Sequence, residues 1–325
     1  MKKTGSKITD FNIKQIVKTI GKILSILSIV FIGVKIYKLG FDPKVIENVP
    51  AFIAISVIAV LMKMFSVVTS ASGWRRWISL FSGRKIRFWD AFYIYGKAGI
   101  GKYLPGNVMH YVERNIFAAE YGLPQTKIAA GSVLETLELV IAALFMSLIL
   151  LPISYRQKVL KLIYERKTFL IILILICFFI FVAIFAIVLI KCRYIKGIIS
   201  EYKFSGLKTF ALTLIEYILT LLLLGGGMVL MWMFCTQESP DAESLRLMIS
   251  AYSTAWVCGF VIPGASGGIG IREAILSVLL DGLASGQVIM FIIIAHRLIT
   301  IIGDFAVYAI VTLISSFSSK KQLSE

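Results

Sequence analysis

The sequence has few charged residues for its length. They make up 16% of the 325-residue chain, whereas a soluble domain carries roughly a quarter. Hydrophobic residues make up 58%, and the mean hydropathy is +0.87. Apolar runs such as residues 169–190 are long enough to cross a hydrocarbon core of about 30 Å as helices. The composition therefore excludes an ordinary soluble globular protein and predicts a polytopic membrane protein.

Cysteine and acidic residues are also scarce. Cys177, Cys192, Cys235 and Cys258 show no CxxC spacing, which argues against a disulfide framework and against a zinc site. We therefore expect no metal and no cofactor. The excess of basic residues gives a net charge of +16. In a membrane protein such residues mark cytoplasmic loops and contact anionic headgroups, so we do not expect a nucleic acid partner.

One stretch, VIPGASGGIGIREAIL at 261–276, is rich in glycine but lacks the other parts of a nucleotide-binding motif. No Gly-Lys-Ser/Thr follows its glycines and no β-strand is expected before them, so both the P-loop and the dinucleotide fingerprints fail. We interpret its break residues as helix-breaking and close-packing positions. They are Pro263, Gly264, Gly267, Gly268 and Gly270.

Apolar runs predict six membrane-spanning helices and two interrupted segments. The predicted spans are about 17–38, 49–70, 126–152, 169–190, 209–234 and 287–312. The segments 88–122 and 246–282 are each broken by Pro-Gly, which favours a re-entrant hairpin lining a cavity. The predicted fold class is therefore an all-α polytopic membrane protein. Residues 1–325 are expected to form a single integral membrane domain.

The two interrupted segments share the pattern G-x3-P-G-x7-R at an offset of 158 residues. The matching residues are Gly101 and Gly259, Pro105 and Pro263, Gly106 and Gly264, and Arg114 and Arg272. The predicted spans align under the same shift, which predicts an internal repeat with halves at about 15–152 and 169–315. Each half would cross the membrane an odd number of times, so the second half would be inverted.

Charge predicts the orientation of the chain. Basic residues precede the first span and follow the last, which places both termini in the cytoplasm. The loop 153–168 carries five basic residues and one acid, although this topology puts it outside, and its orientation stays open. Inversion would bring the two hairpin tips together near the midplane, where half-helix N-termini offer N–H groups to an anion.

Three stretches, KYLPGNV…ER, PGASGGIGIREAIL and AHRLITIIGDF, resemble the lysylphosphatidylglycerol synthase transmembrane-region family. This flippase-like family includes the membrane halves of the bacterial multiple peptide resistance factors, and the likeness runs from about residue 15 to 315. It implies movement of a lipid or lipid-linked anionic headgroup between leaflets. An aminoacyl-phosphatidylglycerol or a polyprenyl-phosphate-linked species would be such a substrate. The alternative is a non-transporting membrane subunit, or a transferase, of lipid-linked glycan or aminoacyl-lipid synthesis.

The resemblance also implies a setting. We expect a protein of the bacterial or archaeal cell membrane that contacts anionic lipids, with a lipid-modifying or glycan-assembly enzyme or a second copy as further partners. Two-part relatives carry a soluble aminoacyl transferase domain after the membrane region. No such domain follows here, so synthase activity is not expected and no catalytic residue is identified.

Arg114 and Arg272 are the first candidates for substrate binding. An arginine at membrane depth costs at least about 2.5–3.5 kcal/mol, so it needs a partner or a wet cavity. A phosphate headgroup suits the planar guanidinium. The alternative is structural pairing, of Arg114 with Glu113 or Glu138 and of Arg272 with Glu273.

A second candidate cluster comes from two predicted spans. Glu138 matches His296 under the 158-residue shift, and Arg297 adjoins that histidine. Such a Glu–His–Arg cluster could neutralise a headgroup or relay a proton, and Asp304, seven residues after Arg297, could join it. The alternative is interhelical pairing. Glu135 lies three residues before Glu138 and so shares its helix face.

Other polar residues have simpler interpretations. Lys63 is expected to extend its ammonium group to the membrane interface. Lys102 flanks the first Pro-Gly break and could line a cytoplasmic vestibule, and His110 is interpreted as a polar hairpin residue. Trp74 and Trp77, in GWRRW, are expected to form an aromatic belt at the interface.

Overall fold

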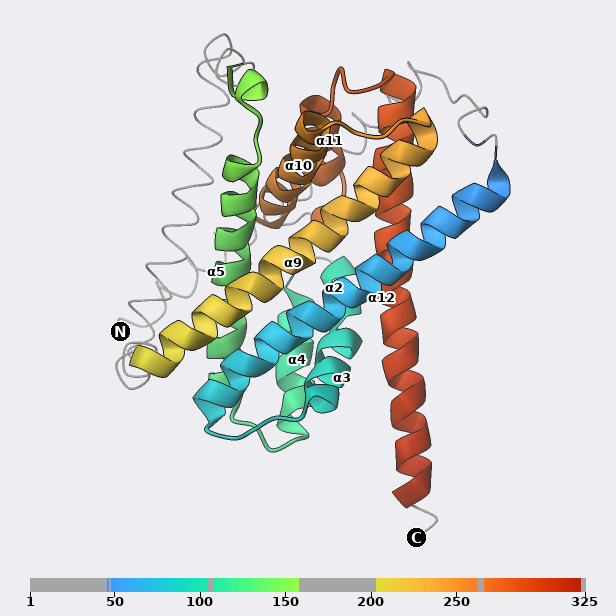
Figure 1. Ribbon diagram of the computed structural model, residues 1–325. Helices are drawn as coiled ribbons and strands as arrows, with labels where there is room; N and C mark the ends of the chain where they lie inside the picture. Colours follow the sequence, from blue (N-terminus) through green and yellow to red (C-terminus); the bar gives the residue numbers. More distant parts are fainter. Residues whose placement is uncertain (1–45, 47, 105–107, 158–202, 262–265, 323–325) are drawn as a thin grey trace, which may run out of the picture.

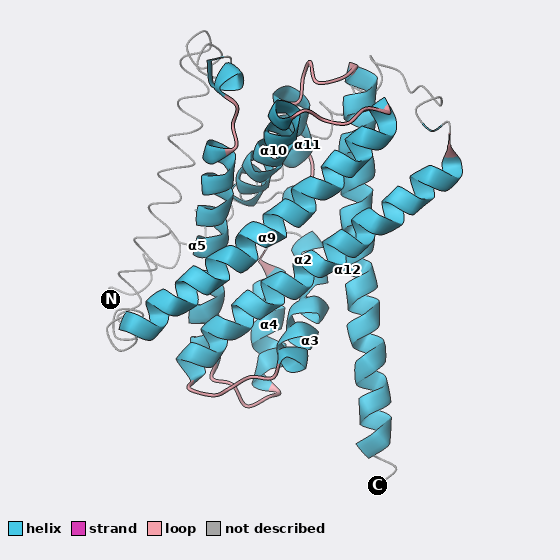
Figure 2. Cartoon of the chain, in the orientation of Figure 1, coloured by secondary structure: helices cyan, strands magenta, loops and turns pink. Residues whose placement is uncertain are grey.

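The computed structural model describes residues 46, 48–104, 108–157, 203–261 and 266–322. Within these residues every regular element is a helix and no strand occurs (Figure 2). The helices long and apolar enough to cross a membrane are Val49–Ser82, Gln125–Ile149, Ser205–Thr236 and Gly286–Ser315. These findings confirm the all-helical class, and the four apolar helices support a membrane-embedded protein. The predicted spans 17–38 and 169–190 lie outside the described residues.

Two long helices, α2 (Val49–Ser82) and α9 (Lys203–Thr236), lie side by side along much of their length (Figure 1). Gly73 allows the close approach, because a Cβ there would lie 2.6 Å from the hydroxyl oxygen of the fully buried Tyr217. Hydroxyl groups also join the pair, with Thr69 Oγ1 2.7 Å from Thr220 Oγ1. This pair forms one wall of the interior.

Both Pro-Gly segments are broken helices. They consist of α3 (Phe88–Ala98), η2 (Gly99–Tyr103) and α4 (Met109–Ala119), and of α10 (Ala242–Val261), η3 (Ser266–Gly268) and α11 (Ile271–Leu279). In each segment the two α-helices pack against each other. Gly267, Gly268 and Gly270 have φ of 59°, 73° and 89°, a left-handed region that disfavours other residues. The breaks at Pro105, Gly106, Pro263 and Gly264 lie outside the described residues.

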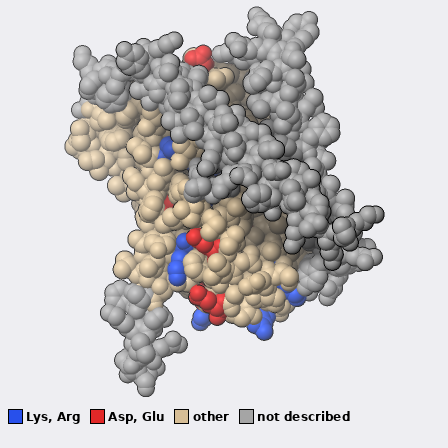
Figure 3. All heavy atoms as spheres, turned by 180° about the vertical axis from the view of Figure 1, so that it is seen from behind, with Lys and Arg blue, Asp and Glu red and all other residues tan. Residues whose placement is uncertain are grey.

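Two further long helices complete the bundle. Helix α5 (Gln125–Ile149) packs against α10, α2 and α9, and α12 (Gly286–Gln322) packs against α2, α9 and α3. On the face opposite to that in Figure 1, charged side chains gather mainly toward the end that holds α3 and α4 (Figure 3). Much of the remaining described surface on this face carries no charge, as expected of a surface in contact with lipid.

The tryptophans of GWRRW do not form an interfacial belt. Helix α2 continues past the predicted end at residue 70, and Trp74 and Trp77 are only 0% and 5% exposed. Their indole N–H groups donate to Ser132 Oγ at 3.0 Å and to Glu138 Oε2 at 2.8 Å. The prediction was wrong because α2 packs against α5 at this level, so the rings face the protein interior.

Candidate binding cavity

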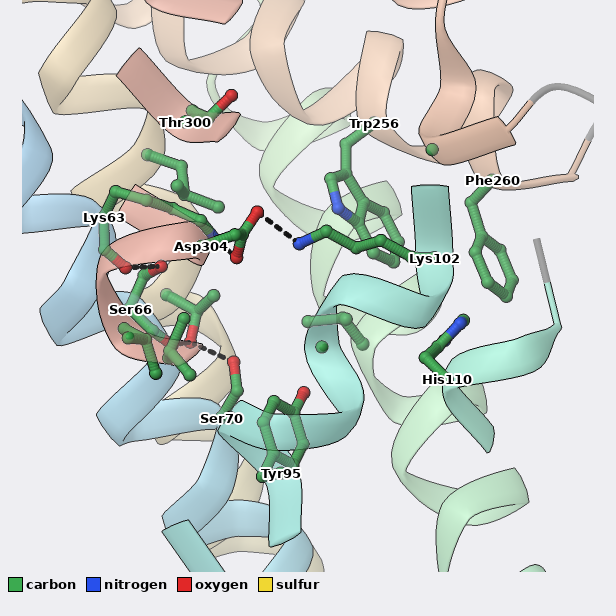
Figure 4. Close-up of a pocket in the computed structure, with 18 of the residues that line it drawn as sticks. Lys63, Ser66, Ser70, Tyr95, Lys102, His110, Trp256, Phe260, Thr300 and Asp304 are labelled. Carbon is green, nitrogen blue, oxygen red and sulfur yellow. Dashed lines mark hydrogen bonds and ion pairs between the residues drawn. The ribbon is translucent and has the colours of Figure 1, made fainter. Parts of the chain in front are cut away.

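A cavity of about 150 Å³ lies between the two broken segments and the long helices (Figure 4). Arg114, from α4 of the first segment, and Arg272, from α11 of the second, both line it. The aromatic rings of Trp256 and Phe260 face it from α10. The two arginines that share the repeated sequence pattern therefore line the same cavity.

The charged lining of the cavity is predominantly positive. It consists of Lys63, Lys102, Arg114, Arg272, Arg297, Glu135 and Asp304. Five cations against two carboxylates leave a formal excess of three positive charges in the lining, and of two when Glu273, which pairs with Arg297 from outside the lining, is counted. A cavity among packed helices screens charge less than bulk water does, so this excess favours an anionic occupant.

Arg114 is neutralised by a carboxylate within the protein. Its Nη1 lies 2.6 Å from Glu135 Oε2, and the two side chains are only 5% and 4% exposed. The Tyr95 hydroxyl donates to the other carboxylate oxygen at 2.7 Å, and the guanidinium carbon lies 3.7 Å from the centroid of the Tyr95 ring. The alternative considered from the sequence, a pair with Glu113 or Glu138, was therefore wrong about the partner. Arg114 forms a buried structural ion pair and also lines the cavity.

Arg272 is not neutralised in this way. Among the described residues no carboxylate forms an ion pair with it, and its Nε is inaccessible and lacks a hydrogen-bond partner. The side chain runs close to the backbone of Gly259, where a Cβ would lie 2.5 Å from Arg272 Cγ. Its guanidinium carbon lies 5.6 Å from the centroid of the Trp256 ring. The glycine and the ring hold a cation at the cavity without cancelling its charge.

Glu273, the partner considered for Arg272, instead contacts Arg297 and Gly270. Its Oε1 lies 3.2 Å from Arg297 Nε, and its Oε2 accepts the backbone N–H of Gly270 at 2.6 Å. Arg297 also donates to the carbonyl oxygen of Gly267 at 2.5 Å. These contacts tie the glycine-rich turn to α12. The alternative of an Arg272–Glu273 pair was therefore wrong, and Arg297 is the residue that Glu273 neutralises.

The expected Glu–His–Arg cluster does not form. His296 Nε2 lies 2.9 Å from the carbonyl oxygen of Leu224, and its ring meets Tyr252 edge-on. Glu138 instead accepts from Trp77 and from Thr213 Oγ1, the latter at 2.6 Å. Interhelical hydrogen bonding, the alternative considered from the sequence, accounts for both side chains. Glu138, His296, Glu113 and Glu273 all lie outside the cavity lining.

A buried cluster centred on Asp304 was not predicted. The Asp304 carboxylate lies between two lysines (Figure 4), at 3.1 Å from Lys63 Nζ and 2.5 Å from Lys102 Nζ. It also accepts from the Tyr103 hydroxyl at 2.7 Å. Lys63 therefore does not reach the interface. The signal was present in the sequence, because a lysine inside one apolar run and an aspartate inside another are natural partners.

The remaining candidates have clear places. His110 is buried and lines the cavity from α4, and Glu113 lies beside η2, close to Gly101. In the described part of the chain no group of three or more His, Cys, Asp or Glu residues could hold a metal ion.

Comparison with known protein families, with curated proteins and with solved structures finds no match to this chain. The function must therefore be inferred from the site itself.

Proposed function

We propose that this protein binds the anionic headgroup of a membrane lipid in the cavity and moves that lipid between the leaflets of the bilayer. The observation that carries the proposal is Arg272, which lines the cavity with no carboxylate partner among the described residues. A cation without a partner at membrane depth is costly, so such residues are usually functional. A phosphate group in the cavity would supply the missing negative charge.

The charge of the cavity also bears on the class of headgroup. Both lining carboxylates already have cationic partners, Glu135 with Arg114 and Asp304 with Lys63 and Lys102. An ammonium-bearing headgroup would add a positive charge to a cavity that already has an excess, whereas a phosphate would reduce that excess. The cavity therefore favours an acidic phospholipid or a polyprenyl-phosphate-linked species over an aminoacyl-phosphatidylglycerol. Lipid movement also agrees with the resemblance to the lysylphosphatidylglycerol synthase transmembrane-region family.

Replacement of Arg272 tests the proposal directly. In the purified full chain we expect Arg272→Ala to weaken binding of a soluble short-chain phosphatidic acid by about 10- to 100-fold, because a charge-assisted hydrogen bond contributes about 1.5–3 kcal/mol. Arg246→Ala is the matched control, since Arg246 is an exposed arginine on α10 outside the cavity lining. Equal affinity in Arg272→Ala and parent would refute the headgroup site.

Translocation needs a second measurement. The full chain would be reconstituted in liposomes with a fluorescent phosphatidic acid in both leaflets, and the fraction accessible to an external quencher followed with time. We expect the parent to speed exchange between leaflets and Arg272→Ala to lose most of that activity. Binding without exchange would contradict transport and support the alternative of a non-transporting membrane subunit.

We further propose that the chain is an inverted repeat with two re-entrant hairpins, six spans and both termini in the cytoplasm. In support, each half contains a long helix, a broken pair and a second long helix, and α2 and α9 both have 34 residues. Cysteines at Ser239 and Ser319 in a cysteine-free background test the topology. We expect an impermeant reagent to label the first from outside and the second from the cytoplasm. The reverse pattern at either position would refute it.

A further inference from the structure

A second concavity, of about 670 Å³, lies next to the charged cavity. It is formed by α2, α3, α9 and α12, and its lining consists of aliphatic, methionine and aromatic side chains with no charged group. Several of these side chains are exposed at its surface, among them Phe65, Trp89 and Ile314. Below, this concavity is called the apolar groove.

The apolar groove and the charged cavity share a thin wall. Val307 of α12 lines both. The neighbouring helices also have one face on each side, since Lys63 lines the cavity while Phe65 lines the groove. The wall is closed by close packing, because a Cβ at Gly96 would lie 2.8 Å from Val307 Cγ1. At this point the side chain of Val307 is what separates the two spaces.

We propose that the apolar groove holds a hydrocarbon chain of the same lipid whose headgroup occupies the cavity, and that the Gly96–Val307 contact is where that lipid crosses the wall. The proposal rests on the proposed function. If the phosphate of a lipid lies in the cavity, the hydrocarbon chains of that lipid must extend out of the cavity by some route. The groove offers an uncharged surface with no ionic partner to satisfy, adjoining a positively charged one, which matches an amphiphile with an anionic end.

A photoreactive lipid tests this arrangement in the reconstituted full chain. The probe is phosphatidic acid with a diazirine in one acyl chain, and the control is phosphatidylcholine with the same chain. We expect phosphatidic acid to label residues 61–68 and 88–92 several-fold more than phosphatidylcholine does. The difference should disappear in Arg272→Ala and in excess glycerol phosphate. Val68→Trp, which fills the groove, should reduce the labelling, whereas Leu148→Trp on the exposed face of α5 should not.

The outcomes separate the two proposals. Equal labelling by both lipids, or labelling by phosphatidic acid that persists in Arg272→Ala, would mean that the groove holds ordinary surrounding lipid and would overturn the inference. Cross-links between two copies through the groove would assign it to a second copy and also overturn it. Binding of glycerol phosphate alone tests the headgroup site. If glycerol phosphate binds in the parent while labelling is unselective, only the groove inference fails.

Discussion

Arg114 and Arg272 are expected to respond differently to the same substitution. Arg114→Met should destabilise the protein strongly, because it removes the cation that neutralises a buried carboxylate. Arg272→Met should leave the melting temperature close to that of the parent while weakening phosphate binding, because no carboxylate among the described residues depends on Arg272. Methionine is chosen because it retains most of the apolar stem of arginine, so that the charge is the main change.

The magnitude for Arg114 follows from its contacts. Its Nη1 lies 2.6 Å from Glu135 Oε2 and both side chains are almost fully buried. Without the arginine, the Glu135 carboxylate retains the Tyr95 hydroxyl as a hydrogen-bond donor. Removing one partner of a buried ion pair costs about 3–5 kcal/mol, because the remaining charge has lost its compensation. Adding Glu135→Gln to Arg114→Met should recover much of this loss, since the remaining charge is then removed as well.

Thermal unfolding of the purified variants in one detergent measures the difference. We expect a clear fall in melting temperature for Arg114→Met, partial recovery in the double variant and little change for Arg272→Met. With Glu135→Gln also measured alone, the double-mutant cycle should give a coupling between Arg114 and Glu135 at or above the upper end of the range of about 0.5–3 kcal/mol found for contacting residues. Equal falls for both arginine variants would refute the reasoning. Strictly additive losses in the double variant would also refute it.

Two further substitutions test the packing and the charge of the site. Gly73→Ala would place a Cβ 2.6 Å from the Tyr217 hydroxyl and should cost about 1–3 kcal/mol in thermal unfolding. Gly206→Ala, with no atom within 4 Å of its added Cβ, is the control and should not destabilise the protein. Ile293 lines a small cavity together with Arg272, so Ile293→Glu should neutralise the arginine and weaken glycerol phosphate binding relative to the uncharged Ile293→Gln. Equal binding by these two variants would contradict that expectation.

The helical membrane class could be predicted because hydropathy is a property of each segment alone. The position at which α2 ends could not be predicted from the sequence. Beyond residue 70 the sequence becomes more polar, but the helix continues because Trp74 and Trp77 find hydrogen-bond partners on α5. The sequence does not distinguish a polar side chain that forms its hydrogen bonds with a neighbouring helix from one that forms them with water.

The arginines of the site could be predicted from their rarity at membrane depth, but their partners could not. Glu135 and Glu138 are three residues apart and so differ by about 60° around the helix axis. That difference turns Glu135 toward the cavity and Arg114, and Glu138 toward Trp77 and Thr213. The choice between them depends on the rotation of α5 against its neighbours, which is a property of the packed bundle.

The proposed repeat gives a physical reason for the difference between the two arginines. The 158-residue shift that matches Arg114 with Arg272 places Ile293 at the position of Glu135. Ile293 is 1% exposed and lines a small cavity with Arg272, so an apolar side chain stands where the first half has its counter-ion. Glu273 also lines that small cavity, but its ion pair is with Arg297. If the two halves served only to hold each other in place, each arginine would need its own carboxylate. The apolar residue at this position in the second half leaves Arg272 without a carboxylate partner at the shared cavity, which is why we propose Arg272 as the residue that an anion neutralises.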